Sequence, residues 1–144
     1  MTIRDILRGK GGQVVTVESG TAVLDAMRIL VRHNIGALVV WDGDELRGIM
    51  SERDLLRAGA VDLTRLATAC VGDLMTRDVV VGTPELELHE VMDTLTERRI
   101  RHLPVMEDGA LAGMVSIGDV VNALRRDTED EVHYLHAYIA GAPL

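Results

Sequence analysis

The sequence predicts an α/β fold made of two copies of one β-α-β-β-α unit, followed by an extended C-terminal helix. Three observations support this prediction. A shift of 65 residues aligns 13–54 with 78–119 without a gap, and eleven of these 42 positions are identical, whereas chance would give about two or three. Both copies show the same order of strand-like and helix-like apolar patterns, and a helical pattern continues beyond the second copy. The chain is therefore an internal repeat.

Each copy is expected to begin with a short lead and a β-branched strand. The leads are IRDIL at 3–7 and VGDLM at 71–75, which correspond at a shift of 68 residues, so the segment 9–12 carries a three-residue insertion. The runs VVTV at 14–17 and VVVG at 79–82 are rich in the β-branched residues that favour strands. Strands are therefore expected at both runs.

A helix, a hairpin and a second helix follow in each copy. Apolar residues recur at helical spacing over 21–33 and 86–98, which predicts amphipathic helices. Paired apolar runs come next, ALVVW with LRGIM and HLPVM with LAGMV, and the turn sequences between them predict two hairpins. A further helix is expected after Ser51 and after Ser116.

The segment 122–139 prolongs the last helix and carries a candidate apolar stripe. The predicted organisation is a first repeat over 1–62, a second repeat over 63–126 and a C-terminal helical extension over 127–144. Because one repeat is too small to close a core alone, the two are expected to pack together. The extension is a candidate contact surface for another subunit.

Charge and composition argue against several classes of protein. A net charge of −8 opposes a general nucleic-acid binder, because phosphate contacts usually come from a basic face. Aromatic residues make up 2% of the chain, too few for the stacking platforms that grip single-stranded nucleic acids. No apolar run approaches the ~18 residues that span a bilayer, the N-terminal segment lacks the apolar core of a signal peptide, and Cys70 is the single cysteine. We therefore expect a cytoplasmic protein without nucleic-acid or membrane partners.

Four motifs and one lead carry a resemblance to a known family: NIGALVV (34–40), GIMSERDLL (48–56), RIRHLPV (99–105), GMVSIGDVV (113–121) and DLMT (73–76). Together they resemble the tandem CBS domain pair, also called a Bateman module. The resemblance implies two units related by a pseudo-twofold axis, assembly into a homodimer, and binding of an adenine nucleotide as a regulatory ligand. AMP is the expected ligand, and similar proteins bind ATP, NAD or S-adenosylmethionine.

The repeated Ser-x-x-Asp motif is the expected ribose and phosphate site. A Ser at the end of a strand can hold an anionic phosphate together with the free backbone N–H groups of the following helix. An Asp in the first helical turn can accept hydrogen bonds from both ribose hydroxyls. The resemblance assigns Asp54 and Asp119 to the ribose, and Ser51 and Ser116 to the phosphate side. The motif is also a capping box, and the two interpretations are compatible.

Basic residues distinguish the two copies. Arg101 and His102 enter the second hairpin and are candidates for phosphate binding, whereas the first copy has glycine and alanine at these positions. Arg53 is a further candidate in the first copy, where the second has glycine. The alternative for the basic cluster is a solvated helix end, where cations are favourable. The two sites are therefore expected to differ in chemistry.

With so few aromatic residues, the adenine ring is expected to pack on aliphatic side chains. The candidates are apolar residues of the strands near the motif: Val15, Ile49, Met50, Val80, Pro104, Met114 and Val115. Any hydrophobic core would contain the same residues, so the pattern leaves both roles open.

The motifs predict binding and give no positive sign of catalysis. The sequence has no Ser/His/Asp or Cys/His constellation, no metal site is expected, and GKGG at 9–12 lacks the spacing of a phosphate loop, which indicates a flexible turn. The expected function is a regulatory module that senses an adenine nucleotide, requires no cofactor, and acts on an unknown protein partner in trans. The alternative is a scaffold that dimerises without ligand, and an enzyme comes third.

Overall fold

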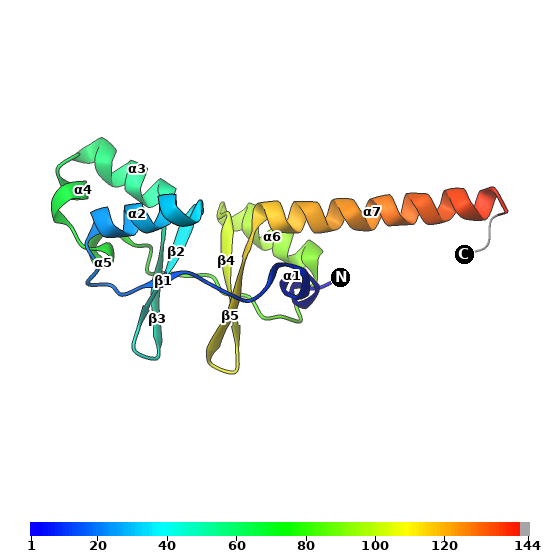
Figure 1. The fold of residues 1–144 in the computed structure, drawn as a ribbon, viewed down its shortest axis with the longest axis horizontal. Coiled ribbons are helices and arrows are strands. Elements are labelled where there is room, and N and C mark those ends of the chain that lie inside the picture. Colours follow the sequence, from blue (N-terminus) through cyan, green and yellow to red (C-terminus); the bar gives the residue numbers. More distant parts are fainter. Residues whose placement is uncertain (142–144) are drawn as a thin grey trace. The chain divides into compact units, whose positions relative to one another are not determined.

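The N-terminal lead of the chain packs with the second repeat, and the second lead packs with the first. The computed structural model describes residues 1–141 and divides the chain into two compact units (Figure 1). Unit 1 consists of Met1–Gly12 and the described residues from Val81 onward, and unit 2 consists of Gln13–Val80. The compact units therefore exchange the leads of the two sequence repeats.

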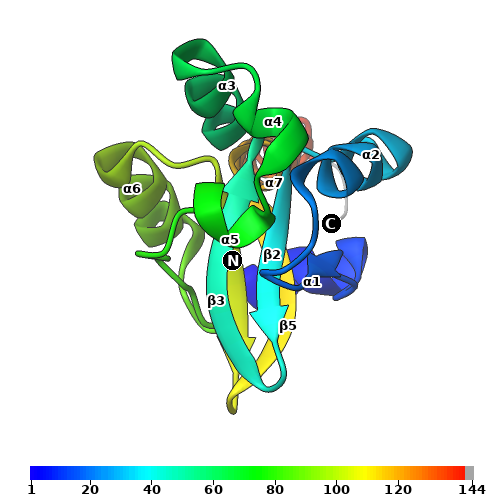
Figure 2. The ribbon, with the colours of Figure 1, turned by 90° about the vertical axis from the view of Figure 1, so that its left-hand side faces the viewer.

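Unit 2 is a three-stranded sheet with helices packed against it. Its elements in chain order are β1 (Thr16–Val17), α2 (Val23–His33), β2 (Ala37–Asp42), β3 (Glu45–Ser51), α3 (Glu52–Val61), α4 (Arg65–Thr68) and α5 (Val71–Leu74). β1 pairs with β2 in parallel, and β2 and β3 form an antiparallel hairpin. Helices α2, α3 and α4 gather around one end of this hairpin (Figure 2).

The core of unit 2 includes residues from the second lead. The buried cluster joins apolar residues of the sheet, of α2 and of α5: Val17, Ala26, Leu30, Leu38, Val40, Met50, Val71 and Met75. Full burial of a large apolar side chain stabilises a fold by roughly 1.5–3 kcal/mol. Val71 is completely buried, so the second lead supplies part of the stability of the first repeat.

Unit 1 repeats this architecture around a two-stranded sheet. Its elements are α1 (Ile3–Lys10), α6 (Leu88–Arg98), β4 (His102–Glu107), β5 (Ala110–Ser116) and α7 (Ile117–Ile139). The strands β4 and β5 are antiparallel. Ile3 of α1 is completely buried, and its N–H donates to the carbonyl of Leu86 at 3.0 Å. Arg4 adds ion pairs to Glu85 and Glu107, so α1 is held to the second repeat by apolar and polar contacts.

The strand expected at the start of each copy is shorter than the sequence predicts. The first run forms a strand only at Thr16–Val17, and the second forms a single parallel bridge between Gly82 and Val105. In the first copy the N–H of Val39 donates to the carbonyl of Val15 at 3.4 Å. Pro104 stands at the corresponding position of the second copy and has no N–H to donate. One donor of the ladder is therefore missing there.

The two hairpins have the same register. β2–β3 pairs Ala37 with Ser51, and β4–β5 pairs His102 with Ser116. Each hairpin also has an irregularity at the same place, after Val40 in the first copy and after Val105 in the second. Because register decides which face each side chain takes, the two serines occupy equivalent positions at the ends of their strands.

The extended C-terminal helix is confirmed as α7, whose far half reaches beyond the other elements of unit 1 (Figure 1). The predicted extension 127–144 is helical up to Ile139, and its residues 142–144 lie outside the described part of the chain. Among residues 1–141, no helix combines the length and apolar character needed to cross a membrane. The mixed α/β class, with two small sheets and seven helices in the described residues, is confirmed.

Candidate functional site

The first Ser-x-x-Asp motif lies where β3 ends and α3 begins in unit 2. The backbone N–H of Ser51 donates to Asp54 Oδ2 at 2.8 Å, and the N–H of Asp54 donates to Ser51 Oγ at 3.4 Å. This reciprocal pair satisfies two backbone donors at the helix start and is a capping box. The capping interpretation of this motif is therefore confirmed.

The second motif has the same geometry at the β5–α7 junction of unit 1. The N–H of Ser116 donates to Asp119 Oδ2 at 2.8 Å, and the N–H of Asp119 donates to Ser116 Oγ at 3.1 Å. Both aspartates and both serines are half-buried. Capping fixes the carboxylates in the first turn, where the helix dipole favours negative charge, and leaves them within reach of solvent.

A threonine from the second lead covers the junction in unit 2. Thr76 Oγ1 donates to Asp54 Oδ1 at 2.9 Å, and the backbone N–H of Thr76 donates to the carbonyl of Ile49 at 2.8 Å. The N–H of Ile49 donates back to the carbonyl of Thr76 at 3.0 Å. The junction in unit 2 is thus closed on one side by a neutral hydroxyl.

A lysine from the first lead covers the junction in unit 1. Lys10 Nζ donates to Asp119 Oδ2 at 2.6 Å and to the carbonyl of Met114 at 2.9 Å. Met114 and Asp119 stand at the positions that Ile49 and Asp54 occupy in the first copy. One ammonium in unit 1 therefore contacts the carboxylate and the strand carbonyl whose counterparts in unit 2 accept from the hydroxyl and the N–H of Thr76.

The contacts of Asp119 alter its acidity. Partial burial opposes ionisation of this carboxyl, but the hydrogen bond from Lys10, the backbone hydrogen bond from Ser116 and the positive charge of Lys10 outweigh burial. Together they hold the pKa of Asp119 below its ordinary value. The carboxylate is therefore ionised throughout the neutral range.

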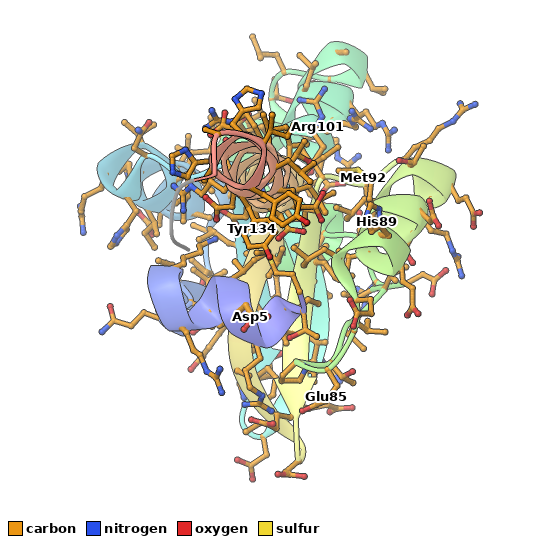
Figure 3. The ribbon with its side chains drawn as sticks, turned by 90° about the vertical axis from the view of Figure 1, so that its right-hand side faces the viewer. Asp5, Glu85, His89, Met92, Arg101 and Tyr134 are labelled. Atoms are coloured by element: carbon orange, nitrogen blue, oxygen red, sulfur yellow. The ribbon has the colours of Figure 1, made fainter. Side chains whose placement is uncertain are left out.

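The structure brings the predicted basic residues of the second copy to the junction in unit 1. His102 is half-buried and pairs directly with Ser116 across the hairpin. The carbonyl of Arg101 accepts the N–H of Ile117, the first residue of α7, at 2.8 Å, and the side chain of Arg101 is exposed (Figure 3). Pro104 is buried two residues further along β4. The backbone of Arg101 and the His102–Ser116 pair thus lie at the start of α7.

Arg53, the basic candidate of the first copy, is exposed in the first turn of α3 beside Asp54. The Gly36–Ala37 segment meets the start of α3, where the carbonyl of Gly36 accepts the N–H of Glu52 at 3.0 Å. The junction in unit 2 therefore lacks counterparts of Arg101 and His102, as the sequence predicts.

The adenine candidates divide by burial. Met50 and Val115 are completely buried within their units. Ile49 and Met114 precede them in the strands, point to the opposite face and are half-buried. Val15 and Val80 are half-buried as well. Of the adenine candidates that lie within the strands, Ile49 and Met114 are the ones that solvent reaches.

Sequence reasoning missed Lys10 and Thr76 as residues of the junctions. Lys10 belongs to GKGG, interpreted from the sequence as a flexible turn, and Thr76 belongs to DLMT. The available signal was the three-residue insertion in the first lead, since an insertion in one copy marks the place where the copies differ. Among residues 1–141, no group of three His, Cys, Asp or Glu side chains is arranged to hold a metal ion.

Comparisons with known proteins place the chain in a family. Residues 3–61 and 71–126 each match the family model described as CBS domain. The mitochondrial CBS domain-containing protein CBSX3 of Arabidopsis thaliana is 40% identical over 149 residues, which cover 97% of this chain and 72% of that protein.

Solved structures agree with this match. A CBS-domain containing protein from Agrobacterium tumefaciens is 40% identical, with a TM-score of 0.83 over 85% of this chain and 98% of that one. A CBS domain pair solved in complex with 5′-methylthioadenosine and S-adenosyl-L-methionine is 25% identical, with a TM-score of 0.76 over 86% of this chain and 99% of that one. The two family matches, the repeated strand–helix junctions and these relatives show that the chain belongs to the CBS domain family and carries two CBS domains.

Proposed function

We propose that this chain is a regulatory module that binds an adenine nucleotide, with AMP preferred and NAD or ATP as further ligands, and acts on a protein partner in trans. One observation carries the proposal: in unit 1, Asp119, Ser116 and His102 meet at the N-terminus of α7, with the backbone of Arg101 bonded to its first residue. The carboxylate suits ribose hydroxyls, while the serine, the helix N-terminus and the basic side chains suit a phosphate.

The two junctions differ in charge, which favours different occupancy. Unit 1 brings basic residues to its junction, whereas unit 2 presents the Gly36–Ala37 segment there, with Arg53 on the helix. A related CBS domain pair binds two different adenosine-containing molecules, which supports this ligand class for the present chain. We expect the junction in unit 1 to prefer a phosphorylated ligand.

Occupancy regulates a partner only if the ligand binds two arrangements of the protein with different affinity. We propose that such a difference is passed to a partner protein in trans. The module itself performs no reaction in this proposal. The cytoplasmic location expected from the sequence stays a prediction, and one relative is named as mitochondrial.

We also propose that the protein is a homodimer that uses α7. Four apolar side chains at helical spacing are exposed on its far half: Val132, Leu135, Tyr138 and Ile139, with exposed fractions of 46, 54, 70 and 79%. Tyr134 lies on the same helix and is exposed as well (Figure 3). A second copy would bury these side chains. Light scattering should show a dimer for the wild type and a monomer for Leu135→Glu combined with Tyr138→Glu.

The same exposed surface favours a second candidate function, a dimerising scaffold that binds no nucleotide. Thermal unfolding distinguishes the two. A ligand present at about 100 times its dissociation constant adds roughly 2.7 kcal/mol to the free energy of unfolding. We expect AMP to raise the midpoint in a concentration series, with smaller shifts for ATP, NAD and S-adenosylmethionine. A dimer whose midpoint responds to none of these ligands would support the scaffold instead.

The site assignment is tested with a matched control. Asp54→Ala combined with Asp119→Ala should abolish AMP binding by calorimetry while the protein stays folded. The control is Asp5→Ala, because Asp5 forms a similar capping box with Thr2 at the start of α1 but belongs to neither junction. It should lose stability and keep its AMP affinity. Equal affinity in the double variant and the wild type would show that the ribose site lies elsewhere.

A further inference from the structure

The two junctions are equivalent in backbone and differ in the group that covers them. In unit 2, Thr76 donates from its hydroxyl to Asp54 and from its N–H to Ile49. In unit 1, Lys10 Nζ makes both corresponding contacts, to Asp119 and Met114. A cation from the first lead thus lies at the junction in unit 1, where unit 2 has a neutral hydroxyl from the second lead.

The insertion in the first lead delivers this cation. Helix α1 ends at Lys10, and the N–H of Gly11, at a φ of 92°, donates to the carbonyl of Leu7 at 2.7 Å. Gly12 then passes so close to β5 that a Cβ on it would lie 2.6 Å from the carbonyl oxygen of Ala112. The glycines therefore let the chain turn and run against β5, which sets Lys10 beside Met114 and Asp119.

Lys10 changes the charge at the ribose carboxylate. An ionised Asp beside a phosphate repels it, and a cation in contact with the carboxylate cancels most of that repulsion. Both contacts of Asp119, from Ser116 and from Lys10, fall on Oδ2, so Oδ1 can still accept from a ribose hydroxyl. An ammonium has three protons, and the contacts to Asp119 and Met114 use two of them. The third can donate to an anion.

Solvent reaches this pair. The side chain of Lys10 is 41% exposed and that of Asp119 is 26% exposed. A nucleotide whose ribose contacts Asp119 Oδ1 therefore meets Lys10 without breaking the pair. A charged donor to a phosphate oxygen makes a stronger hydrogen bond than a neutral one.

We propose that Lys10 is a specificity-determining residue that makes the junction in unit 1 select phosphorylated adenine nucleosides over neutral ones. The inference rests on the proposed function, because it requires an adenine nucleotide at this junction. In unit 2 the neutral Thr76 contacts the equivalent acceptors. We therefore expect the charged lead residue to discriminate between phosphorylated and neutral nucleosides in unit 1.

The experiment compares the affinities of AMP and adenosine by calorimetry on the full chain. All variants carry Asp54→Ala, which removes the ribose carboxylate of unit 2, so that the junction in unit 1 is measured. Lys10→Met removes the charge and keeps much of the side-chain length, and Lys10→Arg keeps the charge. We expect Lys10→Met to lower the ratio of AMP affinity to adenosine affinity about tenfold, the effect of losing one charged hydrogen bond. Lys10→Arg should keep the ratio close to that of the parent.

The outcomes separate the inference from the proposed function. An unchanged ratio in Lys10→Met, or an equal loss of both affinities, overturns the specificity role and leaves nucleotide binding intact. Binding by the wild type that disappears with Asp54→Ala alone places the nucleotide at unit 2 and also overturns the inference. Failure of the wild type and of every variant to bind either AMP or adenosine overturns the proposed function, and the inference falls with it.

Discussion

Lys10 and Asp119 are 109 positions apart in the chain, and their side chains meet with 2.6 Å between Nζ and Oδ2. The contact exists because α1 packs with the second repeat rather than with the first. It joins the lead, the hairpin and the last helix of unit 1 at the point where the ribose carboxylate is expected. The exchange of leads therefore has a consequence for the candidate site as well as for the core.

The serine caps are expected to stabilise both units. Ser51→Ala and Ser116→Ala each remove the side-chain acceptor of a helix N-terminal N–H, which typically costs about 1 kcal/mol. Denaturant unfolding measures this loss. Replacement by threonine, which can still accept, should recover most of it. Alanine variants as stable as the wild type would mean that the hydroxyls contribute through ligand contacts alone.

The free energy of unfolding should depend on pH through Asp119. Its folded pKa lies below the unfolded value of about 3.9, so the folded state binds fewer protons than the unfolded state as the pH falls. The stabilisation by Asp119 is therefore fully present above the unfolded pKa and is lost as the pH falls through the folded pKa. We expect the stability difference between wild type and Asp119→Asn to be constant above about pH 5 and to shrink below pH 4.

Lys10→Met is the matched control for this pH dependence. It removes the hydrogen bond and the charge that help to lower the pKa of Asp119, but leaves the capping contact with Ser116. The decrease in the free energy of unfolding at low pH should therefore be smaller in Lys10→Met than in the wild type. The same pH profile in both proteins would show that Lys10 does not set the acidity of Asp119.

Two equivalent glycines should respond differently to alanine. A Cβ on Gly48 would lie 2.6 Å from the carbonyl oxygen of Thr76, whereas a Cβ on Gly113 would lie 2.6 Å from Cδ2 of Leu7. A methyl at the end of a flexible side chain can move aside, and a backbone oxygen bonded to Ile49 cannot do so cheaply. We expect Gly48→Ala to cost about 1–3 kcal/mol in the free energy of unfolding, and Gly113→Ala to cost less.

Gly20 provides the control for this comparison, because a Cβ on it meets nothing within 4 Å. Gly20→Ala should leave the denaturation midpoint almost unchanged. A larger loss for Gly113→Ala than for Gly48→Ala would contradict the close approach of the second lead to β3.

The exchanged first lead should stabilise unit 1. Ile3 is completely buried in that unit, and Ile3→Ala is expected to cost about 2–5 kcal/mol in the free energy of unfolding. Hydrogen exchange locates the effect: amides of β4 and β5 should lose protection, while those of β2 and β3 keep it. Val31→Ala is the control, since this side chain is 81% exposed. It should change neither the free energy of unfolding nor the protection of the strand amides. Loss of protection confined to β2 and β3 would contradict the packing of the first lead with the second repeat.

The repeat made much of the candidate site predictable. Ser51 and Asp54 recur as Ser116 and Asp119, and both pairs form capping boxes because that interaction is local to four consecutive residues. His102 meets Ser116 because hairpin register follows from two apolar runs and a short turn. The α/β class, the hairpins and the C-terminal helix were predicted for the same reason, since each depends on neighbouring residues.

Short patterns gave less reliable predictions where distant segments compete. Three of the four residues at 79–82 are β-branched, against all four at 14–17, yet the second run contributes a single bridge. Pro104, on another strand, removes the donor that such a ladder needs. The burial of Met50 and the partial exposure of Ile49 likewise depend on which face of the hairpin the helices cover.

The sequence by itself determined the repeat, the order of its elements and the paired serine and aspartate at each strand–helix junction, because all of these depend on local spacing. Only the tertiary structure decided that the leads are exchanged, that Thr76 covers Asp54 and that Lys10 covers Asp119. These contacts join residues 22 and 109 positions apart, and they depend on which hairpin offers each lead a buried apolar surface.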